Sequence, residues 1–290
     1  MNTPPVIAIR GLVKTYPGMG RPAVDGIDLE IARGETFALL GPNGAGKSTT
    51  VEILEGFRAA TAGTVQVLGA NPARGGPEWK ARIGVVLQDA LADSVLTVRE
   101  ELDFHAALYP KPLDTDAVLA DIGLADKAKA RVTALSGGQR RRLDVALAII
   151  GRPELLFLDE PTTGFDPQAR RAFWELIRGL GAQGATILLT THYLEEAAAL
   201  ANRAAVIDRG RLIATGTMAD LGGPQAHVPA VRWTDPDGAP REERTTEPGR
   251  LVARLVSEQG GEPAGLTVTR PTVEDVYLGL IGRDREEALA

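Results

Sequence analysis

Four short apolar runs decide which folds are open to this chain of 290 residues. Polar and apolar side chains do not alternate along any of them, so each run is apolar on both faces. Such runs are typical of strands in a parallel sheet that helices cover on both sides, and they are too short for buried helices. The runs lie at residues 37–40, 83–87, 155–158 and 186–190.

Helical patterns separate these runs, and the alternation of strands and helices predicts an α/β fold. The stretch from about residue 90 to 150 is mostly helical and lies between two of the strands, so we expect it to form a helical subdomain. The helical patterns lie at residues 47–55, 98–108, 139–150, 169–180 and 194–201.

The composition changes after Gly216. Residues 222–250 are rich in Pro, Gly, Asp, Glu and Arg, which favours turns and edge strands, with a hairpin turn at 235–238. We therefore divide the chain into a main domain at residues 1–220 and a small accessory α/β domain at 221–290. Further elements of the accessory domain are expected at residues 250–258 (helix), 266–270 (strand) and 273–281 (helix).

The overall composition excludes several classes of protein. The net charge of -6 argues against broad nucleic-acid binding, which normally requires a basic face. The absence of cysteine excludes disulfide bonds and thiolate metal sites, and it fits a reducing compartment. No apolar run approaches the roughly 20 residues that a membrane-spanning helix needs, and the N-terminus lacks the pattern of a signal peptide. We therefore expect any membrane role to depend on a partner.

A glycine-rich segment follows the run at 37–40 and leads into the helical pattern that begins at Lys47. It matches the pattern G-x-x-x-x-G-K-[ST], in which glycines let backbone N–H groups surround phosphate oxygens at the start of a helix. Lys47 is predicted to neutralise the β- and γ-phosphates, and Ser48 to offer its hydroxyl to Mg²⁺. A glycine-rich turn is the alternative, but the flanking strand and helix favour a phosphate loop. Its residues are Gly41, Pro42, Asn43, Gly44, Ala45, Gly46, Lys47, Ser48 and Thr49.

Two carboxylates end the third apolar run, in the sequence LLFLDEP. Open α/β sheets bind ligands at the carboxyl ends of their strands. Asp159 is therefore expected to hold Mg²⁺, directly or through water, and Glu160 to orient and deprotonate the attacking water. An Asp-Glu pair alone fits a solvated strand end equally well, but the phosphate loop upstream favours the functional interpretation.

The other two runs end in similar side chains: Gln88 follows the second run and His192 the fourth. A single histidine is more often structural than catalytic. The alignment of His192 with the other strand ends nevertheless favours a role beside phosphate, metal or water. The sequence thus predicts that polar groups from four strands gather at one edge of the sheet.

The segment LSGGQ opens another of the helical patterns. Ser136 is a natural N-cap and Gln139 completes a capping box, which is the simplest interpretation. Two details favour a function beyond capping. Gly137 and Gly138 are poor helix formers, and three arginines at 140–142 lie where the helix dipole disfavours positive charge. We expect this helix start to bind an anion, here the γ-phosphate.

The order of phosphate loop, LSGGQ and LLFLDEP resembles the ABC ATPase family over residues from about 6 to 220. The resemblance implies a P-loop NTPase fold with a mainly parallel central sheet and an N-terminal antiparallel β portion, and it implies ATP and Mg²⁺ as cofactors. It also implies a homodimer with its subunits head to tail, in which Ser136 and Gly138 of one copy contact ATP held by the other.

Four further residues take their roles from this resemblance. Tyr16 matches the aromatic residue that stacks on adenine. Gln88 matches a residue that senses Mg²⁺ and couples to the transport partner, and Asp166 matches the loop that links the two subunits' sites. His192 matches a histidine that contacts the γ-phosphate. Phe165 departs from the leucine that is commoner in the family, but the exchange stays apolar.

The tail RPTVEDVYLGLIG at residues 270–282 resembles the C-terminal extension of the daunorubicin-resistance group of bacterial ABC exporters. This resemblance implies an ATPase that energises export of a small molecule or lipid-like compound through a separately encoded integral-membrane permease. It also implies a cytoplasmic protein that lies peripherally on the inner face of the cell membrane.

Two alternative functions fit the sequence less well. A soluble ABC ATPase in DNA repair would carry a long coiled-coil insertion, and one in translation would carry two ATPase units, whereas neither pattern occurs here. The second alternative is a P-loop GTPase or a small-molecule kinase. A GTPase would usually show Asn/Thr-Lys-x-Asp to bind guanine, and the sequence holds no such tetrapeptide. We therefore expect an export ATPase without a nucleic-acid partner.

Overall fold

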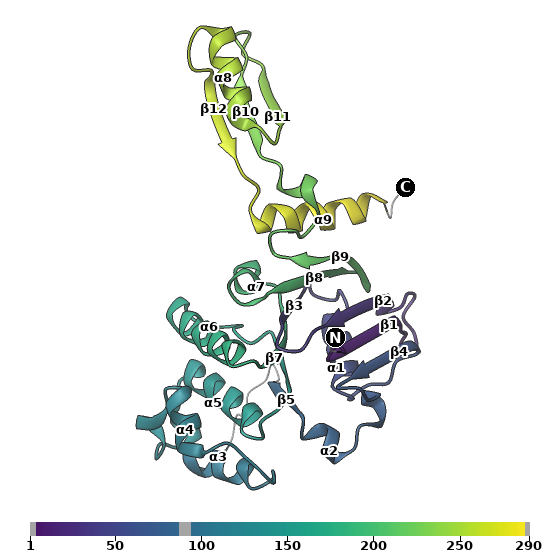
Figure 1. The fold of residues 1–290 in the computed structure, drawn as a ribbon, viewed down its shortest axis with the longest axis vertical. Coiled ribbons are helices and arrows are strands. Elements are labelled where there is room, and N and C mark those ends of the chain that lie inside the picture. The colour runs from purple at the N-terminus through teal and green to yellow at the C-terminus, as the bar shows by residue number, and fades with distance from the viewer. Residues whose placement is uncertain (1–3, 87–93, 288–290) are drawn as a thin grey trace. The chain divides into compact units, whose positions relative to one another are not determined.

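The computed structural model describes residues 4–86 and 94–287, with side chains up to residue 282 (Figure 1). The chain divides into two compact units, Met1–Leu212 and Ile213–Ala290. None of the helices in the part of the chain that the structure describes is long and apolar enough to cross a membrane.

A six-stranded sheet forms the centre of the first unit, with the strand order β5-β6-β7-β3-β8-β9. The pairs from β5 through to β8 are all parallel, and each of the four apolar runs forms one of these strands, as expected. Helices cover the sheet, since α5 (Gly137–Ile149) packs on β5, α1 (Lys47–Leu54) on β6, and α7 (Leu194–Leu200) on β3 and β7. The strands are β3 (Thr36–Leu40), β5 (Ile83–Val86), β6 (Leu155–Asp159), β7 (Thr186–Thr191), β8 (Arg203–Asp208) and β9 (Arg211–Thr217).

A three-stranded antiparallel sheet is built from two strands that precede β3 and one that follows it, as the antiparallel portion implied by the family resemblance. Its order is β2-β1-β4, and β2 buries Val24, Ile27, Leu29 and Ile31 while the residues between them lie toward solvent. This alternation is the mark of a sheet with one covered face. The strands are β1 (Ile7–Lys14), β2 (Val24–Ile31) and β4 (Ala62–Val67).

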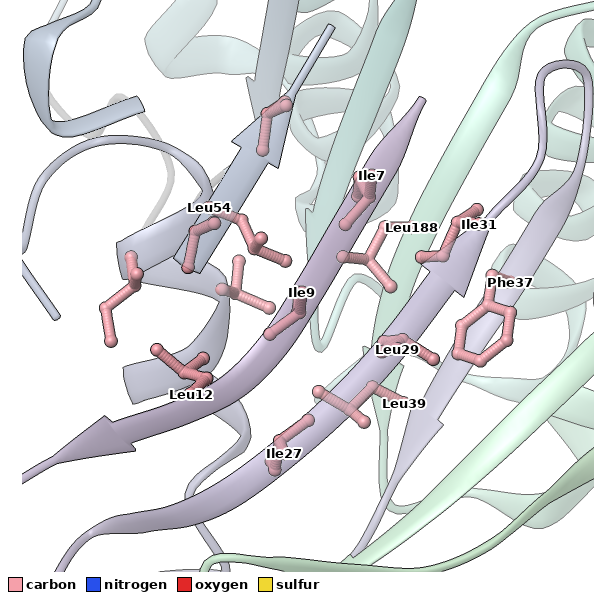
Figure 2. Packing of buried hydrophobic residues seen from close by; sticks show 14 of the residues in the cluster. Ile7, Ile9, Leu12, Ile27, Leu29, Ile31, Phe37, Leu39, Leu54 and Leu188 are labelled. Atoms are coloured by element: carbon pink, nitrogen blue, oxygen red, sulfur yellow. The ribbon is translucent and has the colours of Figure 1, made fainter. Parts of the chain in front are cut away.

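One hydrophobic core joins the two sheets of the first unit (Figure 2). Ile9 of β1 and Leu29 of β2 pack in the same cluster as Leu54 at the end of α1 and Leu188 of β7. Fully burying an aliphatic side chain contributes roughly 1.5–3 kcal/mol, so a cluster of this size is able to fix the start of α1 against the sheet edge. The position of the phosphate loop therefore rests on this core.

The helices of the first unit have clear beginnings. Thr97 and Glu100 form a capping box at the start of α3, and Asp114 caps α4. Figure 1 shows α3, α4 and α5 grouped together, as expected of a helical subdomain. The helices are α1 (Lys47–Leu54), α2 (Pro77–Lys80), α3 (Val98–Ala106), α4 (Thr115–Asp121), α5 (Gly137–Ile149), α6 (Pro167–Ala182) and α7 (Leu194–Leu200). Short 3₁₀ turns lie at Pro72–Arg74, Ala125–Lys127 and Val132–Ala134.

The second unit holds a three-stranded antiparallel sheet with the order β11-β10-β12. A turn at residues 235–238 joins β10 to β11, with Gly238 at φ 86°, as the sequence predicted. Helix α8 covers one face through Leu251 and Leu255, which pack on Val231. The elements are β10 (Ala230–Thr234), β11 (Pro240–Arg244), α8 (Pro248–Gln259), β12 (Ala264–Thr269), α9 (Val273–Glu287) and a 3₁₀ turn at Pro224–His227.

Candidate functional site

The predicted phosphate loop connects β3 to α1 by a tight, glycine-dependent path. A Cβ atom on Gly41 would lie 2.3 Å from the carbonyl oxygen of Ile207, and one on Gly46 would lie 2.4 Å from that of Ala23. Gly46 also has a φ of 107°, which side chains rarely allow. Both glycines are therefore required by the space around them, so this loop cannot be an ordinary turn with interchangeable residues.

Lys47 is nearly fully buried, with 5% of its surface exposed. Its Nζ donates to the carbonyl oxygens of Gly41 at 2.8 Å and Pro42 at 3.2 Å, and it lies 3.8 Å from Oε1 of Glu160. Burial lowers the pKa of Lys47 below its ordinary value, while the carboxylates of Glu160 and Asp159 oppose that shift. The loop thus holds a cation whose neighbours are carbonyls and carboxylates.

A cleft of about 470 Å³ opens over this loop. Tyr16 lines it, and the Tyr16 hydroxyl lies 3.5 Å from Oγ1 of Thr49. Lys14 and Arg58 both lie near the Tyr16 ring, with Lys14 Nζ at 5.2 Å and Arg58 Cζ at 5.6 Å from its centroid. The lining residues are Tyr16, Met19, Arg21, Pro22, Ala23, Asn43, Gly44, Gly46, Lys47, Ser48, Thr49, Glu160 and Arg209.

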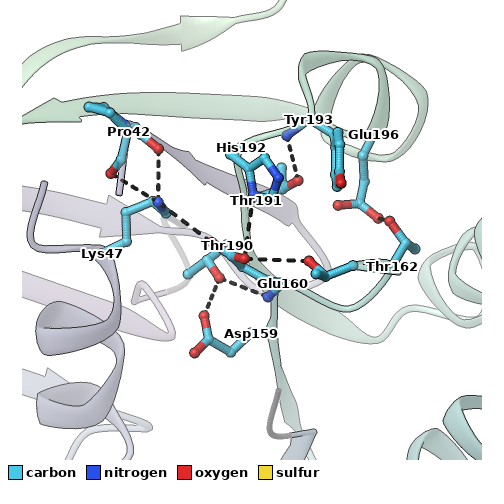
Figure 3. A network of polar contacts seen from close by, with 12 residues as sticks. Pro42, Lys47, Asp159, Glu160, Thr162, Thr190, Thr191, His192, Tyr193 and Glu196 are labelled. Atoms are coloured by element: carbon cyan, nitrogen blue, oxygen red, sulfur yellow. Dashed lines mark hydrogen bonds and ion pairs between the residues drawn. The ribbon is translucent and has the colours of Figure 1, made fainter. Parts of the chain in front are cut away.

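The carboxylates at the end of β6 are held by the neighbouring strand β7 (Figure 3). Thr190 is fully buried, and its hydroxyl donates to Oδ1 of Asp159. The same hydroxyl oxygen accepts the backbone N–H of Glu160 at 3.0 Å, and the Thr190 carbonyl oxygen accepts it at 3.2 Å. One threonine therefore orients both acidic residues.

Glu160 has a left-handed backbone conformation with a φ of 43°. Its carboxylate lies 3.4 Å from Nδ1 of His192 and 3.4 Å from the hydroxyl of Thr163, besides the contact with Lys47. A non-glycine residue at positive φ is uncommon and carries strain of roughly 1 kcal/mol or more. The structure brings Lys47, Asp159, Glu160 and His192 together, whereas Gln88 lies outside the described residues.

The donor atoms at this edge fit a magnesium ion. Within residues 4–86 and 94–287, no three His, Cys, Asp or Glu side chains gather to hold a metal on their own. Mg²⁺ usually takes only one or two protein oxygens and completes its shell with phosphates and water. The exposed hydroxyl of Ser48 and the carboxylate of Asp159 match that demand, so an ion here would depend on the nucleotide.

The segment LSGGQ starts helix α5 as a capping box. The Ser136 hydroxyl accepts the backbone N–H of Gln139 at 3.3 Å, and Oε1 of Gln139 accepts that of Ser136 at 3.0 Å. Ser136 and Gly137 are exposed, whereas Gly138 is partly buried. A Cβ atom on Gly138 would lie 3.1 Å from Cβ of Ala169, so this position has little room for a side chain. The cap that the sequence predicted is confirmed.

Two of the three arginines in this helix start are engaged inside the chain. Arg141 donates to the carbonyl oxygens of Pro161 at 3.0 Å and Asp159 at 3.1 Å. Arg142 donates to those of Ile122 at 2.8 Å and Gly123 at 3.3 Å. Carbonyl oxygens of the chain itself therefore accept N–H groups of both Arg141 and Arg142 and orient the two guanidiniums. Anion binding at this helix start stays a prediction.

Asp166 is the N-cap of α6. Its Oδ1 accepts the backbone N–H groups of Gln168 and Ala169, both at 2.9 Å. This use of the carboxylate is local, and it fixes the end of the loop that begins after Glu160. A role of Asp166 between subunits stays a prediction.

Comparison with known proteins decides the family. The ABC transporter family model matches residues 24–163. The daunorubicin resistance ATP-binding protein DrrA3 of Streptomyces coeruleorubidus is 38% identical, in an alignment that covers 96% of this chain and 96% of that protein. The Nod factor export ATP-binding protein I of Ralstonia nicotianae is 40% identical, with 99% of this chain and 97% of that protein covered. The chain belongs to the family of ABC transporter ATP-binding proteins.

Solved structures agree with this assignment. An ATP-binding subunit of an ABC transporter matches with a TM-score of 0.66 and 27% identity, over 74% of this chain and 91% of that one. An ATP-binding cassette of an ABC transporter in its ADP conformation has the same TM-score at 23% identity, which supports the fold alone. The predictions of a P-loop NTPase fold and of an ABC-type, nucleotide-binding ATPase are confirmed.

Several residues of this ABC ATPase site were not found from the sequence. Arg21 and Arg209 line the cleft but belong to no motif, and only their charge hinted at a phosphate ligand. Thr190 lies in the fourth apolar run, and its contacts follow from the register of β6 against β7. Register between distant strands leaves no local signal, so tertiary structure was needed to find it.

Glu55, the residue that ends α1, is a buried acid close enough to Asp159 to feel its charge. Only 5% of its surface is exposed. Burial raises its pKa to about 8, and the negative charges of Asp159 and Glu52 add to the shift. Near neutral pH this ABC ATPase therefore carries one carboxyl beside its site in the protonated form.

Proposed function

We propose that this ABC ATPase energises the export of a small molecule or lipid-like compound through a separate integral-membrane permease. The observation that carries the proposal is the nearly full-length similarity to ATP-binding proteins named for daunorubicin resistance and Nod factor export. That similarity favours export over DNA repair or translation. The protein would lie in the cytoplasm, peripherally on the inner face of the membrane that holds the permease.

Hydrolysis of ATP would use the residues around the cleft. Tyr16 would stack on adenine, the phosphate loop would hold the phosphates, and Lys47 would neutralise charge on the β- and γ-phosphates. Ser48, Gln88 and Asp159 would hold Mg²⁺, which when bound offsets further negative charge on the phosphates. The 3.8 Å separation of Lys47 Nζ and Glu160 Oε1 supports a site in which the γ-phosphate and the base are neighbours.

Glu160 would accept a proton from the attacking water, and His192 would contact the γ-phosphate. The 3.4 Å distance from His192 Nδ1 to Glu160 Oε2 supports a shared arrangement of these two side chains. The contact of Glu160 with the Thr163 hydroxyl limits the directions in which its carboxylate turns. Phosphoryl transfer requires mainly such positioning and charge stabilisation.

Turnover would require a head-to-tail homodimer, in which Ser136, Gly137, Gly138 and Gln139 of one copy close on the nucleotide of the other. Two observations support this. Among the described residues, the cleft lining includes no part of the segment 136–139. Ser136 is also exposed while its hydroxyl caps α5, so the helix start is open to a ligand supplied from outside the chain.

The variant Glu160→Gln tests the base. It should bind ATP normally, nearly stop hydrolysis and accumulate a dimer in the presence of MgATP, measured by phosphate release and size-exclusion chromatography. Glu195→Gln changes an exposed carboxylate on α7 and serves as the control. Hydrolysis by Glu160→Gln at the wild-type rate would refute the assignment of the base.

The variant Ser136→Arg tests the contribution from the second subunit. It should block hydrolysis while the isolated chain keeps its affinity for ATP, because the arginine obstructs only the closed dimer. Loss of ATP binding by the monomer would place the segment in its own chain's site and contradict the dimer.

Co-expression with the membrane protein encoded in the neighbouring reading frame tests the export proposal. We expect a stable complex whose ATPase activity rises in lipid vesicles compared with the chain alone. Stimulation by duplex DNA, without any effect of the membrane protein, would instead favour the repair function.

A further inference from the structure

Arg141 connects helix α5 to the loop that carries Glu160. Its side chain is almost fully buried, with 5% of its surface exposed. Nε donates to the carbonyl oxygen of Pro161 at 3.0 Å, and a terminal nitrogen donates to that of Asp159 at 3.1 Å. Asp144, one turn along the same helix, lies 3.7 Å from the other terminal nitrogen and steadies the guanidinium.

The two carbonyls belong to the residues on either side of Glu160. The Asp159 carbonyl is in the peptide unit just before Glu160, and the Pro161 carbonyl is in the second peptide unit after it. One planar guanidinium, whose fork of donors suits two separate acceptors, thus holds the backbone on both sides of the base. On the opposite side, Thr190 accepts the backbone N–H of Glu160. These contacts hold the backbone where Glu160 has its strained φ of 43°, a conformation that persists only when its surroundings fix it.

We propose that Arg141 is a positioning residue for Glu160, and that it couples the Ser136–Gln139 segment of each chain to that chain's own base. The proposal rests on the function proposed above, in which that segment closes on the nucleotide of the second subunit. Arg141 lies two residues beyond Gln139 on the same helix, within a distance of roughly 3 Å along its axis.

A helix is stiff over so short a length, so a shift of its first turn moves the guanidinium and the two carbonyls it holds. Closure of α5 on one nucleotide and alignment of Glu160 at the other site then become a single event. A displacement of about 1 Å at a reacting group is enough to cost roughly 10²-fold in rate, which sets the scale of the effect.

Arg142 provides a matched comparison within the same helix. It also donates to two backbone carbonyls, but these belong to Ile122 and Gly123, just after the end of α4. Removing either guanidinium leaves two carbonyls without their donor. Only the loss of Arg141 affects the loop around Glu160.

The test compares Arg141→Met, Arg141→Lys and Arg142→Met in the full chain with MgATP. Arg141→Met should lower kcat by roughly 10²-fold, with KM and the affinity for a fluorescent ATP analogue within about twofold of wild type. Arg141→Lys should recover part of kcat, because an ammonium group reaches one carbonyl. Arg142→Met should keep kcat within about threefold, even where its thermal midpoint falls as far as that of Arg141→Met.

Three results would overturn the proposal: wild-type kcat in Arg141→Met, equal losses of kcat in the two methionine variants, or a loss of ATP affinity in Arg141→Lys. The double variant Glu160→Gln/Arg141→Met should still form the dimer with MgATP, since positioning of the base serves hydrolysis alone. If Glu160→Gln alone remained active, the proposed base would be wrong. If Glu160→Gln is inactive and Arg141→Met is not, only the positioning role fails.

Discussion

Lys47 Nζ lies 3.8 Å from Oε1 of Glu160, so the cation of the phosphate loop and the carboxylate at the end of β6 face each other. They come from segments more than a hundred residues apart in the sequence. The parallel sheet brings their strands to the same edge, with β7 between β3 and β6. A phosphate that displaces the loop carbonyls from Lys47 therefore arrives beside Glu160.

Replacement of Lys47 by methionine should weaken ATP binding about 10- to 100-fold. A hydrogen bond to a charged group contributes roughly 1.5–3 kcal/mol, and each 1.4 kcal/mol is a factor of ten in affinity. Titration with a fluorescent ATP analogue measures the change. Lys127→Met, in a surface 3₁₀ turn, is the control, and an unchanged affinity in Lys47→Met would contradict the role of the loop.

Glu55 should make the stability of the protein fall as pH rises from about 4.5 to about 8. The folded state keeps a proton up to a pKa of about 8, whereas the unfolded chain releases it near the ordinary value of 4.5. One pKa unit corresponds to about 1.36 kcal/mol. The free energy of unfolding of Glu55→Gln, relative to that of wild type, should therefore rise by on the order of 3 kcal/mol between pH 5 and pH 8.

Thermal unfolding at pH 5 and pH 8 checks this, with Glu78→Gln, an exposed acid at the start of α2, as the control. A variant-minus-wild-type difference that is the same at both pH values would show that Glu55 loses its proton normally in the folded state.

Glu196→Ala should destabilise the first unit by about 3 kcal/mol. Oε1 of this fully buried residue accepts the hydroxyl of Thr162 at 2.8 Å and the indole N–H of Trp174 at 3.2 Å. The substitution leaves two donors without their acceptor, at roughly 1–3 kcal/mol for each buried group. Urea denaturation measures it, and the exposed neighbour in Glu195→Ala should change stability by no more than about 0.5 kcal/mol.

Leu255→Ala should loosen the second unit and leave ATP hydrolysis by the first unchanged. Leu255 is one of three buried residues in the small core with Val231 and Leu251, and large-to-alanine changes cost roughly 2–5 kcal/mol. Limited proteolysis should cleave residues 213–290 faster than in wild type. Val256→Ala, at the next position of the same helix, where 37% of the residue is exposed against 5% for Leu255, should not speed cleavage. Equal cleavage of both variants would argue against a separate core.

The sequence predicted those features that depend on local pattern. Consecutive apolar residues identify the central strands in the sequence, because such runs are apolar on both faces. The Ser136–Gln139 capping box is also visible there, because it needs only a spacing of three residues. The composition shift placed the second domain at residue 221, whereas the compact units divide inside β9, between Leu212 and Ile213. The composition boundary marks where turn-forming residues become frequent. The boundary of the compact units depends on contacts between distant residues, which composition does not report.

Contacts between distant segments were not predictable in this way. Arg141 looked like a cation that breaks the helix-dipole rule, because nothing local announces carbonyl acceptors 18 and 20 residues away. The hydrogen bond from Thr190 to Asp159 depends on the register of two strands that are paired only in the fold. In the sequence Glu196 is an ordinary glutamate of a helical pattern. Only the structure shows that it accepts hydrogen bonds from Thr162 and Trp174.

The left-handed backbone at Glu160 lowers the stability of the protein, while the carboxylate at the same position is the one proposed to serve hydrolysis. A glycine at this position would relieve roughly 1 kcal/mol of strain while removing the carboxylate. Selection for a more stable chain alone would therefore act against the residue proposed as the base, and only selection for turnover retains it. Screens that enrich thermostable variants should accordingly be paired with an activity measurement, since position 160 is one where the two traits are opposed.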